Sequence, residues 1–164
     1  MNLGYIGDRT ENVLWRLQNG EIDHIQPKLA LLMIGTNNSN GKECSPEQIA
    51  DGIKAIVRTL RARLPNTKIL ILSIFPRGNA EMKRANAPVA AYNDQWAKCD
   101  EASRIASQMA DGMMIHFLNV NHVFLNEQGE LTRDIMPDLL HPKTKGYRLW
   151  AEAMEPTIAK LMGD

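Results

Sequence analysis

Four short apolar runs stand out along the chain, and each has about the length of a β-strand. They are nearly continuous rather than alternating, which is typical of strands that are buried on both faces of a parallel sheet. The runs are Leu3–Ile6, Leu29–Ile34, Ile69–Ile74 and Met114–Val120. The pattern therefore predicts four buried strands.

Helical patterns lie between these runs. Asp8 and Glu11 have the spacing of an N-cap and its reciprocal partner, directly ahead of a helix over Asn12–Leu17. Further helices are expected from about Val89 to Met109 and from about Thr144 onward.

The second helix is the most clearly marked. Ser45 and Gln48 have the spacing of a capping box, with Pro46 at the first helical position. Isoleucine and leucine then recur at helical spacing until Pro65. We therefore expect a long amphipathic helix between the second and third strands.

Strict alternation of strands and helices predicts an α/β fold with a parallel sheet and helices on both faces. Ligands of such open sheets bind at the carboxyl ends of the strands, so the loops that follow the strands are where chemistry is expected. The irregular segment Phe75–Pro88 follows the third strand and has the composition of a long loop at that edge.

Composition narrows the class of protein. The length of 164 residues corresponds to one domain, which we expect to span residues 1–164. Lysine plus arginine and aspartate plus glutamate each number 19, so the net charge is zero and no nucleic-acid or anionic-membrane partner is indicated.

No apolar run is long enough to span a membrane, and the first residues do not resemble a signal peptide, so export is not expected of the chain as written. The two cysteines, Cys44 and Cys99, are expected to be reduced.

Two strand-end loops contain candidate hydrogen-bond donors. Gly7 leads from the first apolar run toward a helix, where its backbone N–H could stabilise an oxyanion, although a simple turn glycine is the commoner role. Asn37, in the loop after the second run, could present a side-chain N–H₂ at the same edge, or belong to an ordinary polar loop. Phosphate-binding glycine motifs do not occur in the sequence.

A candidate base lies just before the last helix. Pro142 favours an extended conformation at His141, and Asp138 is placed to accept the Nδ1–H of that ring. This spacing indicates the orienter and base of a hydrolytic triad, but it also arises by chance or as part of a metal site. The other histidines, His24, His116 and His122, are expected to be structural or exposed.

In this order, the elements resemble the SGNH (GDSL-type) esterase superfamily, and most closely the branch of the catalytic subunits of intracellular platelet-activating-factor acetylhydrolase. The resemblance covers nearly the whole chain. It is carried by the blocks GDRTENVLWRLQNGE, IQPKLALLMIGTNN, ILSIFPRG and PDLLHPKTKGYRLWAE.

The resemblance implies a flavodoxin-like α/β/α sandwich and a Ser-His-Asp hydrolase of short acyl esters, acetyl esters in particular, with neither a metal nor an organic cofactor. By the same resemblance His141 is the general base and acid, and Asp138 orients it. The backbone N–H of Gly7 and the side chain of Asn37 are oxyanion donors, and Leu140 lines a small acyl pocket.

The family's nucleophilic serine lies in a Gly-Asp-Ser block upstream of the glycine that Gly7 matches. None of the five serines here follows Gly-Asp, and Ser39 is expected to be a loop hydroxyl. We therefore expect the chain to lack the family's first strand and its serine, and to leave a gap beside Leu29–Ile34. The alternative is a non-catalytic relative, or an inactive fragment, that keeps the fold.

Partners follow from the same interpretation. A small-molecule ester is the expected substrate. The loop residues Arg77, Lys83 and Arg84 could contact an anionic substrate or the second subunit of a homodimer, but solvated surface charge is their more common role.

Overall fold

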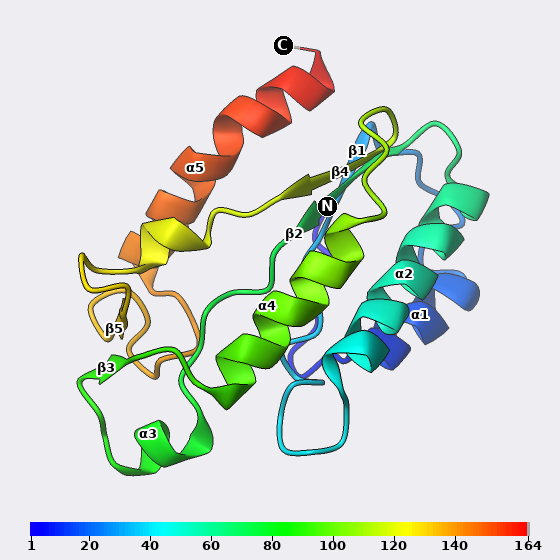
Figure 1. Cartoon of the computed structure of the whole chain (residues 1–164). Helices are drawn as coiled ribbons and strands as arrows, with labels where there is room; N and C mark the ends of the chain where they lie inside the picture. Colours follow the sequence, from blue (N-terminus) through cyan, green and yellow to red (C-terminus); the bar gives the residue numbers. More distant parts are fainter. Residues whose placement is uncertain (164) are drawn as a thin grey trace.

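The computed structural model describes residues 1–163 and confirms the predicted mixed α/β class (Figure 1). The elements are α1 (Thr10–Gln18), β1 (Leu29–Leu32), α2 (Pro46–Arg63), β2 (Lys68–Leu72), α3 (Ala80–Arg84), β3 (Val89–Ala90), α4 (Asp94–Ser107), β4 (Ile115–Leu118), the 3-10 helix η1 (Asn121–Phe124), β5 (Leu131–Thr132) and α5 (Thr144–Met162).

Three strands form the main sheet among the described residues, in the order β1-β2-β4, and both pairings are parallel. Leu31 is opposite Leu70, which is opposite His116 on the other side. A small antiparallel pair, β3 with β5, lies apart from this sheet beside α3 (Figure 1). Parallel pairing brings the carboxyl ends of β1, β2 and β4 to one edge, as the sequence predicts.

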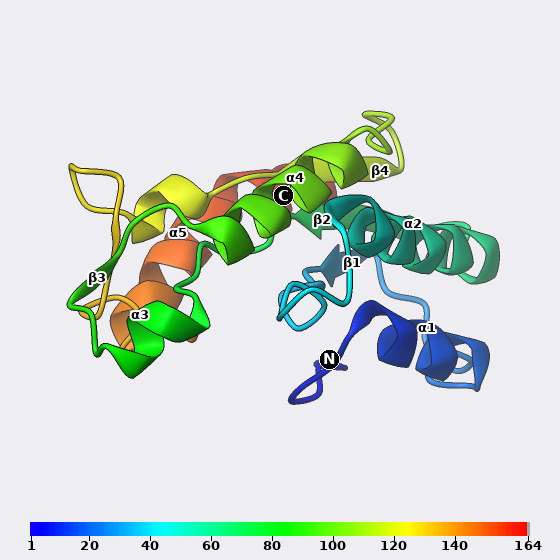
Figure 2. The ribbon, with the colours of Figure 1, turned by 60° about the horizontal axis from the view of Figure 1, so that its bottom comes forward.

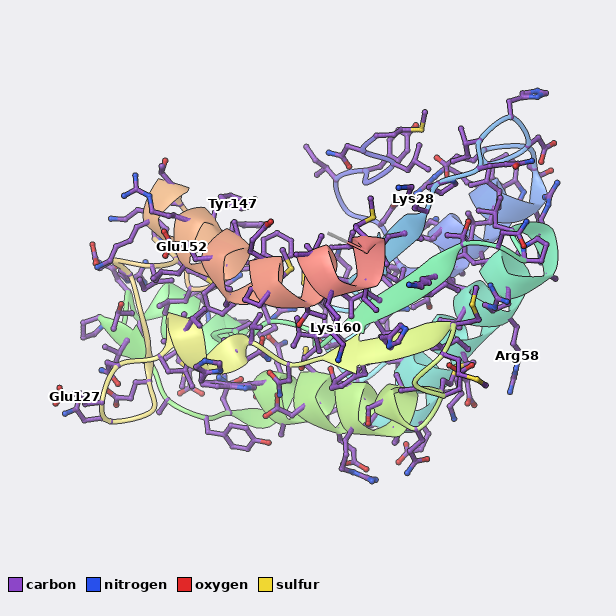
Figure 3. The ribbon with its side chains drawn as sticks, turned by 90° about the horizontal axis from the view of Figure 1, so that it is seen from above. Lys28, Arg58, Glu127, Tyr147, Glu152 and Lys160 are labelled. Carbon is purple, nitrogen blue, oxygen red and sulfur yellow. The ribbon has the colours of Figure 1, made fainter. Side chains whose placement is uncertain are left out.

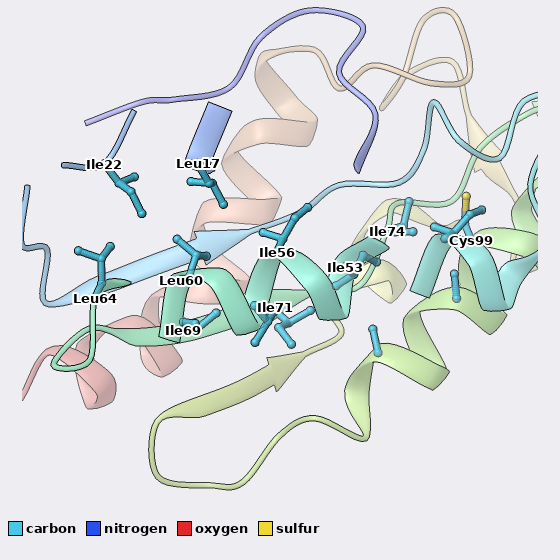
Figure 4. Close-up of a cluster of buried hydrophobic side chains, with 14 residues drawn as sticks. Leu17, Ile22, Ile53, Ile56, Leu60, Leu64, Ile69, Ile71, Ile74 and Cys99 are labelled. Carbon is cyan, nitrogen blue, oxygen red and sulfur yellow. The ribbon is translucent and has the colours of Figure 1, made fainter. Parts of the chain in front are cut away.

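Helices cover both faces of the sheet. Side chains of α1, α2 and α4 pack together against one face, and this cluster is the largest part of the core (Figure 4). Ile49, Ile56 and Val57 of α2 are completely buried there, and each such side chain contributes about 1.5–3 kcal/mol. On the opposite face, Met154 and Leu161 of α5 pack against β2, which gives three layers (Figures 1 and 3).

The α2 N-terminus forms the predicted capping box. The Gln48 N–H donates to Ser45 Oγ at 3.3 Å, and the Ser45 N–H donates to Gln48 Oε1 at 2.8 Å. The cap of α1 differs from the prediction by one residue. Arg9 is the N-cap and its N–H donates to Asn12 Oδ1, because the Asp8 carboxylate forms an ion pair with Arg16 instead.

The first predicted strand is wrong. Leu3–Ile6 does not pair with the sheet but forms a loop on the β1 side of the molecule, closed by a hydrogen bond from the Asp8 N–H to the Tyr5 carbonyl (Figure 2). An extended segment becomes a strand only where a neighbouring strand can take up its backbone groups. Leu3–Ile6 has no such neighbour among residues 1–163.

The predicted helix over Val89–Met109 is also partly wrong. Val89–Ala90 is a strand, because it pairs with Leu131–Thr132. The helix starts only after Asn93, whose side-chain oxygen accepts the N–H groups of Gln95 and Trp96. The segment Phe75–Pro88, predicted to be irregular, contains the short helix α3.

One edge of β1 is open among the described residues, since β1 pairs only with β2. Leu31 is 46% exposed on the sheet face that α5 covers elsewhere, and Met33 is 36% exposed just beyond the strand. None of the helices within residues 1–163 is both long enough and apolar enough to cross a membrane.

The turn into β4 is built around Asp111. Its Oδ1 accepts the backbone N–H groups of Met113, Met114 and Ile115 at 2.8–2.9 Å. These hydrogen bonds favour the charged carboxylate and lower its pKa to about 2.

We predict that Asp111→Asn lowers the Tm of the chain at neutral pH, and that the difference from wild type shrinks as the pH falls from about 4 to 2. The pKa of Asp111 is lower in the folded than in the unfolded state, so its contribution is complete above the unfolded value and is lost on protonation. Thermal unfolding followed by circular dichroism between pH 7 and pH 2 measures this. Glu127→Gln, at the exposed loop tip before β5, is the control (Figure 3). A Tm difference that does not vary with pH would contradict the prediction.

Candidate active site

The loop after β1 begins at Gly35, which only glycine fits. Its φ is +120°, and a Cβ there would lie 2.8 Å from the side chains of both Ile49 and Ile74. A side chain would therefore be strained and would also clash with the core. This close packing fixes where the following loop, Thr36–Asn40, leaves the sheet.

Asn37 reaches across to the turn that contains Gly7. Its Nδ2 donates to the carbonyl oxygen of Asp8 at 2.9 Å, so the two predicted oxyanion donors lie at adjoining loops. Gly7 has a φ of +81°, and a Cβ there would meet no atom within 4 Å. The space beside Gly7 is open, and one of the two N–H groups of the Asn37 amide remains to bind another acceptor.

Asn38 fastens the same loop to the start of α1, a role that the sequence analysis missed. The Thr10 N–H donates to Asn38 Oδ1 at 3.0 Å, and Asn38 Nδ2 donates to Glu11 Oε2 at 3.0 Å. The Gly7 turn and the Thr36–Asn40 loop are thus held together from two sides.

His141 and Asp138 form the pair that their spacing predicts. His141 Nδ1 lies 2.7 Å from Asp138 Oδ2, while Asp138 Oδ1 accepts the backbone N–H groups of Leu140 and His141. The His141 side chain is 75% exposed. With Nδ1–H directed at a carboxylate, the neutral ring leaves Nε2 as the proton acceptor.

Two effects oppose one another at Asp138. Burial raises the pKa of the carboxyl group, but the hydrogen bonds and the nearby ring of His141 outweigh it, so the net pKa is lowered. Asp138 is therefore ionised at neutral pH and can stabilise a positively charged His141.

The residues between Asp138 and His141 are held in an unusual conformation. Leu139 has a φ of +56°, in the left-handed region that a bulky residue rarely adopts, and it is completely buried. Its carbonyl accepts the N–H of Gly78 at 2.8 Å, which compensates for part of that strain.

Leu140 is half-buried next to His141, and its predicted role in an acyl pocket stays a prediction. A nearby hollow of about 560 Å³ lies at the start of α5, but its lining does not include any of the predicted site residues. Its lining residues are Asp134, Lys143, Thr144, Lys145, Arg148 and Leu149.

The serines of the chain are engaged elsewhere. Ser39 is completely buried, and its Oγ donates to the Thr36 carbonyl at 2.8 Å, which confirms the prediction of a loop hydroxyl. The other four hydroxyls also have partners within the fold, in the α2 cap, beside Asn121 and along α4. These residues are Ser45, Ser73, Ser103 and Ser107.

The other three histidines, which were expected to be structural or exposed, are not part of this site. His24 and His122 are exposed, and the His116 ring contacts the Met113 carbonyl. Within residues 1–163, no group of three or more histidine, cysteine, aspartate or glutamate side chains is arranged to hold a metal ion.

The expectation of solvated charge in the Phe75–Pro88 loop is wrong for Arg77. It is only 3% exposed, because the buried run that begins in β2 continues through Phe75 and Pro76 to Gly78. Arg84 is exposed, as expected. The apolar Ile-Phe-Pro sequence directly before Arg77 is the signal that could have predicted its burial.

Comparison with known proteins identifies the family. The sequence model of the GDSL-like lipase/acylhydrolase family matches residues 1–149. Human platelet-activating factor acetylhydrolase IB subunit alpha1 is 35% identical over 162 residues, which is 99% of this chain but 64% of that protein. The chain thus spans a little under two thirds of the length of this curated relative.

Solved structures agree on the fold. A GDSL-like lipase from Bacteroides thetaiotaomicron VPI-5482 superposes with a TM-score of 0.70 at 18% identity, covering 94% of this chain and 72% of that one. A carbohydrate acetylesterase from Sinorhizobium meliloti gives 0.64 at 18% identity, covering 93% and 67%. The predicted flavodoxin-like α/β fold is confirmed. By its sequence and its fold, the chain belongs to the GDSL-like lipase/acylhydrolase family.

Proposed function

We propose that residues 1–164 form a single SGNH hydrolase-like domain that carries the base, its orienting carboxylate and two oxyanion donors of a serine carboxylic ester hydrolase. The observation that carries this proposal is the 2.7 Å contact between His141 Nδ1 and an ionised Asp138 at the carboxyl edge of a parallel sheet. Short acyl esters, and acetyl esters in particular, are the proposed substrates. The names of the acetylhydrolase and acetylesterase relatives support that substrate class.

In the proposed reaction, a serine Oγ attacks the ester carbonyl carbon and His141 Nε2 accepts the hydroxyl proton. Asp138 stabilises the resulting imidazolium. The negative carbonyl oxygen binds the Gly7 N–H and the free N–H of the Asn37 amide. The ester C–O bond then breaks, the alcohol leaves with the proton from His141, and water releases the acyl group from the serine by the same steps.

The serine is proposed to lie upstream of Met1, with a strand that pairs with the open edge of β1. Two observations support this placement. All five serines of the chain are engaged in hydrogen bonds within the fold, and Leu31 and Met33 are exposed beside the edge of β1 that is unpaired within residues 1–163.

The same engagement of the serines favours a second candidate for the chain alone, a non-catalytic SGNH-fold binding protein or inactive fragment. The two candidates differ in whether an upstream segment confers turnover. The following two predictions separate them.

We predict that the 164-residue chain gives neither a burst nor turnover with p-nitrophenyl acetate, and that the chain extended upstream through a Gly-Asp-Ser block hydrolyses it. In the extended chain, His141→Ala should reduce kcat by at least about 10³-fold, because the serine loses its base. His122→Ala, at an exposed histidine, is the control. Turnover by the unextended chain that depends on His141 would place the serine within it, and a fully active His141→Ala would refute the assignment of the base.

Asn37→Ala in the extended chain should lower kcat by about 10²–10³-fold with little change in KM, because an oxyanion donor acts mainly in the transition state. Steady-state kinetics measure this, with Asn66→Ala, at an exposed asparagine distant in sequence from both loops, as the control. An unchanged kcat would show that Asn37 holds the Asp8 turn without contributing to oxyanion binding.

A further inference from the structure

Arg77 is a buried cation, and its side-chain hydrogen-bond partners among residues 1–163 are all neutral groups. Its Nη1 donates to the Thr36 carbonyl at 2.6 Å and also contacts Thr36 Oγ1 and Ser39 Oγ, while Nη2 donates to Asn40 Oδ1 at 2.9 Å. Its Nε is buried without a hydrogen-bond partner among residues 1–163. No carboxylate within the same residues forms an ion pair with it.

Stability is a poor explanation for this arrangement. Removing a guanidinium from water is costly, and no ion pair within residues 1–163 offsets that cost here. Consistent with that cost, burial lowers the pKa of Arg77, and the nearby carboxylates of Asp138 and Asp94 oppose it only in part. The partners of the guanidinium indicate what it does instead.

Every one of those partners belongs to the Thr36–Asn40 loop, which contains Asn37. The two ends of the planar guanidinium bind the beginning and the end of the loop, at Thr36 and Asn40. A forked donor of this kind fixes the orientation of both groups as well as their separation.

The backbone next to Arg77 also contacts the loop that contains Asp138 and His141. The N–H of Gly78 donates to the Leu139 carbonyl at 2.8 Å, between Asp138 and His141. A Cβ at Gly78 would lie 3.0 Å from Leu139 Cβ, so the backbone segments that contain these two residues are in close contact. The Arg77 backbone is held in turn by α4, because the Nδ2 of Asn93 at the start of that helix donates to the Arg77 carbonyl at 2.7 Å.

We propose that Arg77 is a positioning residue of the esterase site, which fixes the Asn37 loop through its guanidinium and the His141 loop through the adjoining Gly78. The proposal rests on the proposed function, since it assigns Asn37 and His141 to one reaction. Arg77 does not touch the substrate. It keeps the oxyanion donor and the base at a constant separation while negative charge develops on the substrate carbonyl oxygen and His141 accepts the serine proton, and its positive charge favours the developing oxyanion.

The first test uses the extended chain and p-nitrophenyl acetate. Arg77→Ala should lower kcat by about 10²-fold and leave KM within about threefold, because a misplaced donor affects the transition state more than substrate binding. Arg77→Lys should not restore kcat, since one ammonium group cannot reproduce the fork that spans Thr36 and Asn40. Guanidinium ion at millimolar concentration should restore part of the activity of Arg77→Ala, and an equal concentration of sodium chloride should not.

Arg84→Ala, at an exposed arginine of α3, is the matched control and should behave as wild type with and without guanidinium. Full activity of Arg77→Lys, or a loss in Arg77→Ala that merely follows the fraction of unfolded protein, would overturn the proposal.

A second test uses the 164-residue chain and does not depend on turnover. In Arg77→Ala, amide hydrogen exchange measured by NMR should accelerate at Ser39 and at Gly78, and stay unchanged at Ile53 in the core. If exchange accelerates but the extended wild type is inactive, the proposed function is disproved, while the role of Arg77 in holding the two loops together is retained. Unchanged exchange at Ser39 and Gly78 would disprove that role of Arg77.

Discussion

The parallel pairing of β2 with both β1 and β4 is the constraint on which the candidate site depends. It sends the chain out of the sheet at the same edge after each strand, so loops distant in sequence become neighbours. The loop after β1 carries Asn37, and the segment after β2 carries Arg77 and Gly78. Asp138 and His141, which come from no strand of the sheet, reach this edge through the contact of Leu139 with Gly78. The site is therefore an assembly of loops around the segment that follows the central strand.

Features that depend on residues close in sequence could be predicted. The α2 capping box joins positions three apart, and so does the contact between Asp138 and His141. In both, side-chain chemistry and local backbone geometry determine the partner, and distant residues matter little. The burial of β2 could be predicted equally well, because a central strand is covered on both faces and its residues after Lys68 are all apolar.

Features that depend on distant partners could not be predicted in this way. Val89–Ala90 is a strand only because Leu131–Thr132, about forty residues later, pairs with it. Leu3–Ile6 has strand-like composition but lacks a neighbour in residues 1–163, and composition alone cannot supply one. For Arg77, the apolar residues directly before it indicate a buried segment, but its partners are distant. Charge predicts exposure on average, whereas the buried guanidinium of this arginine makes four hydrogen bonds to a loop that precedes it by some forty positions.

The open edge of β1 bears on how the isolated chain behaves in solution. Within residues 1–163, β1 has one edge without a pairing strand, flanked by exposed apolar side chains such as Leu31 and Met33, and such an edge is a template for pairing with another extended chain. Charged side chains do little to disfavour such pairing, because Lys28 is the only charged residue between Gln26 and Ile34. As the protein concentration rises, edge-to-edge association of chains is therefore increasingly favoured. The tendency of the chain to associate in solution then indicates whether that edge is covered.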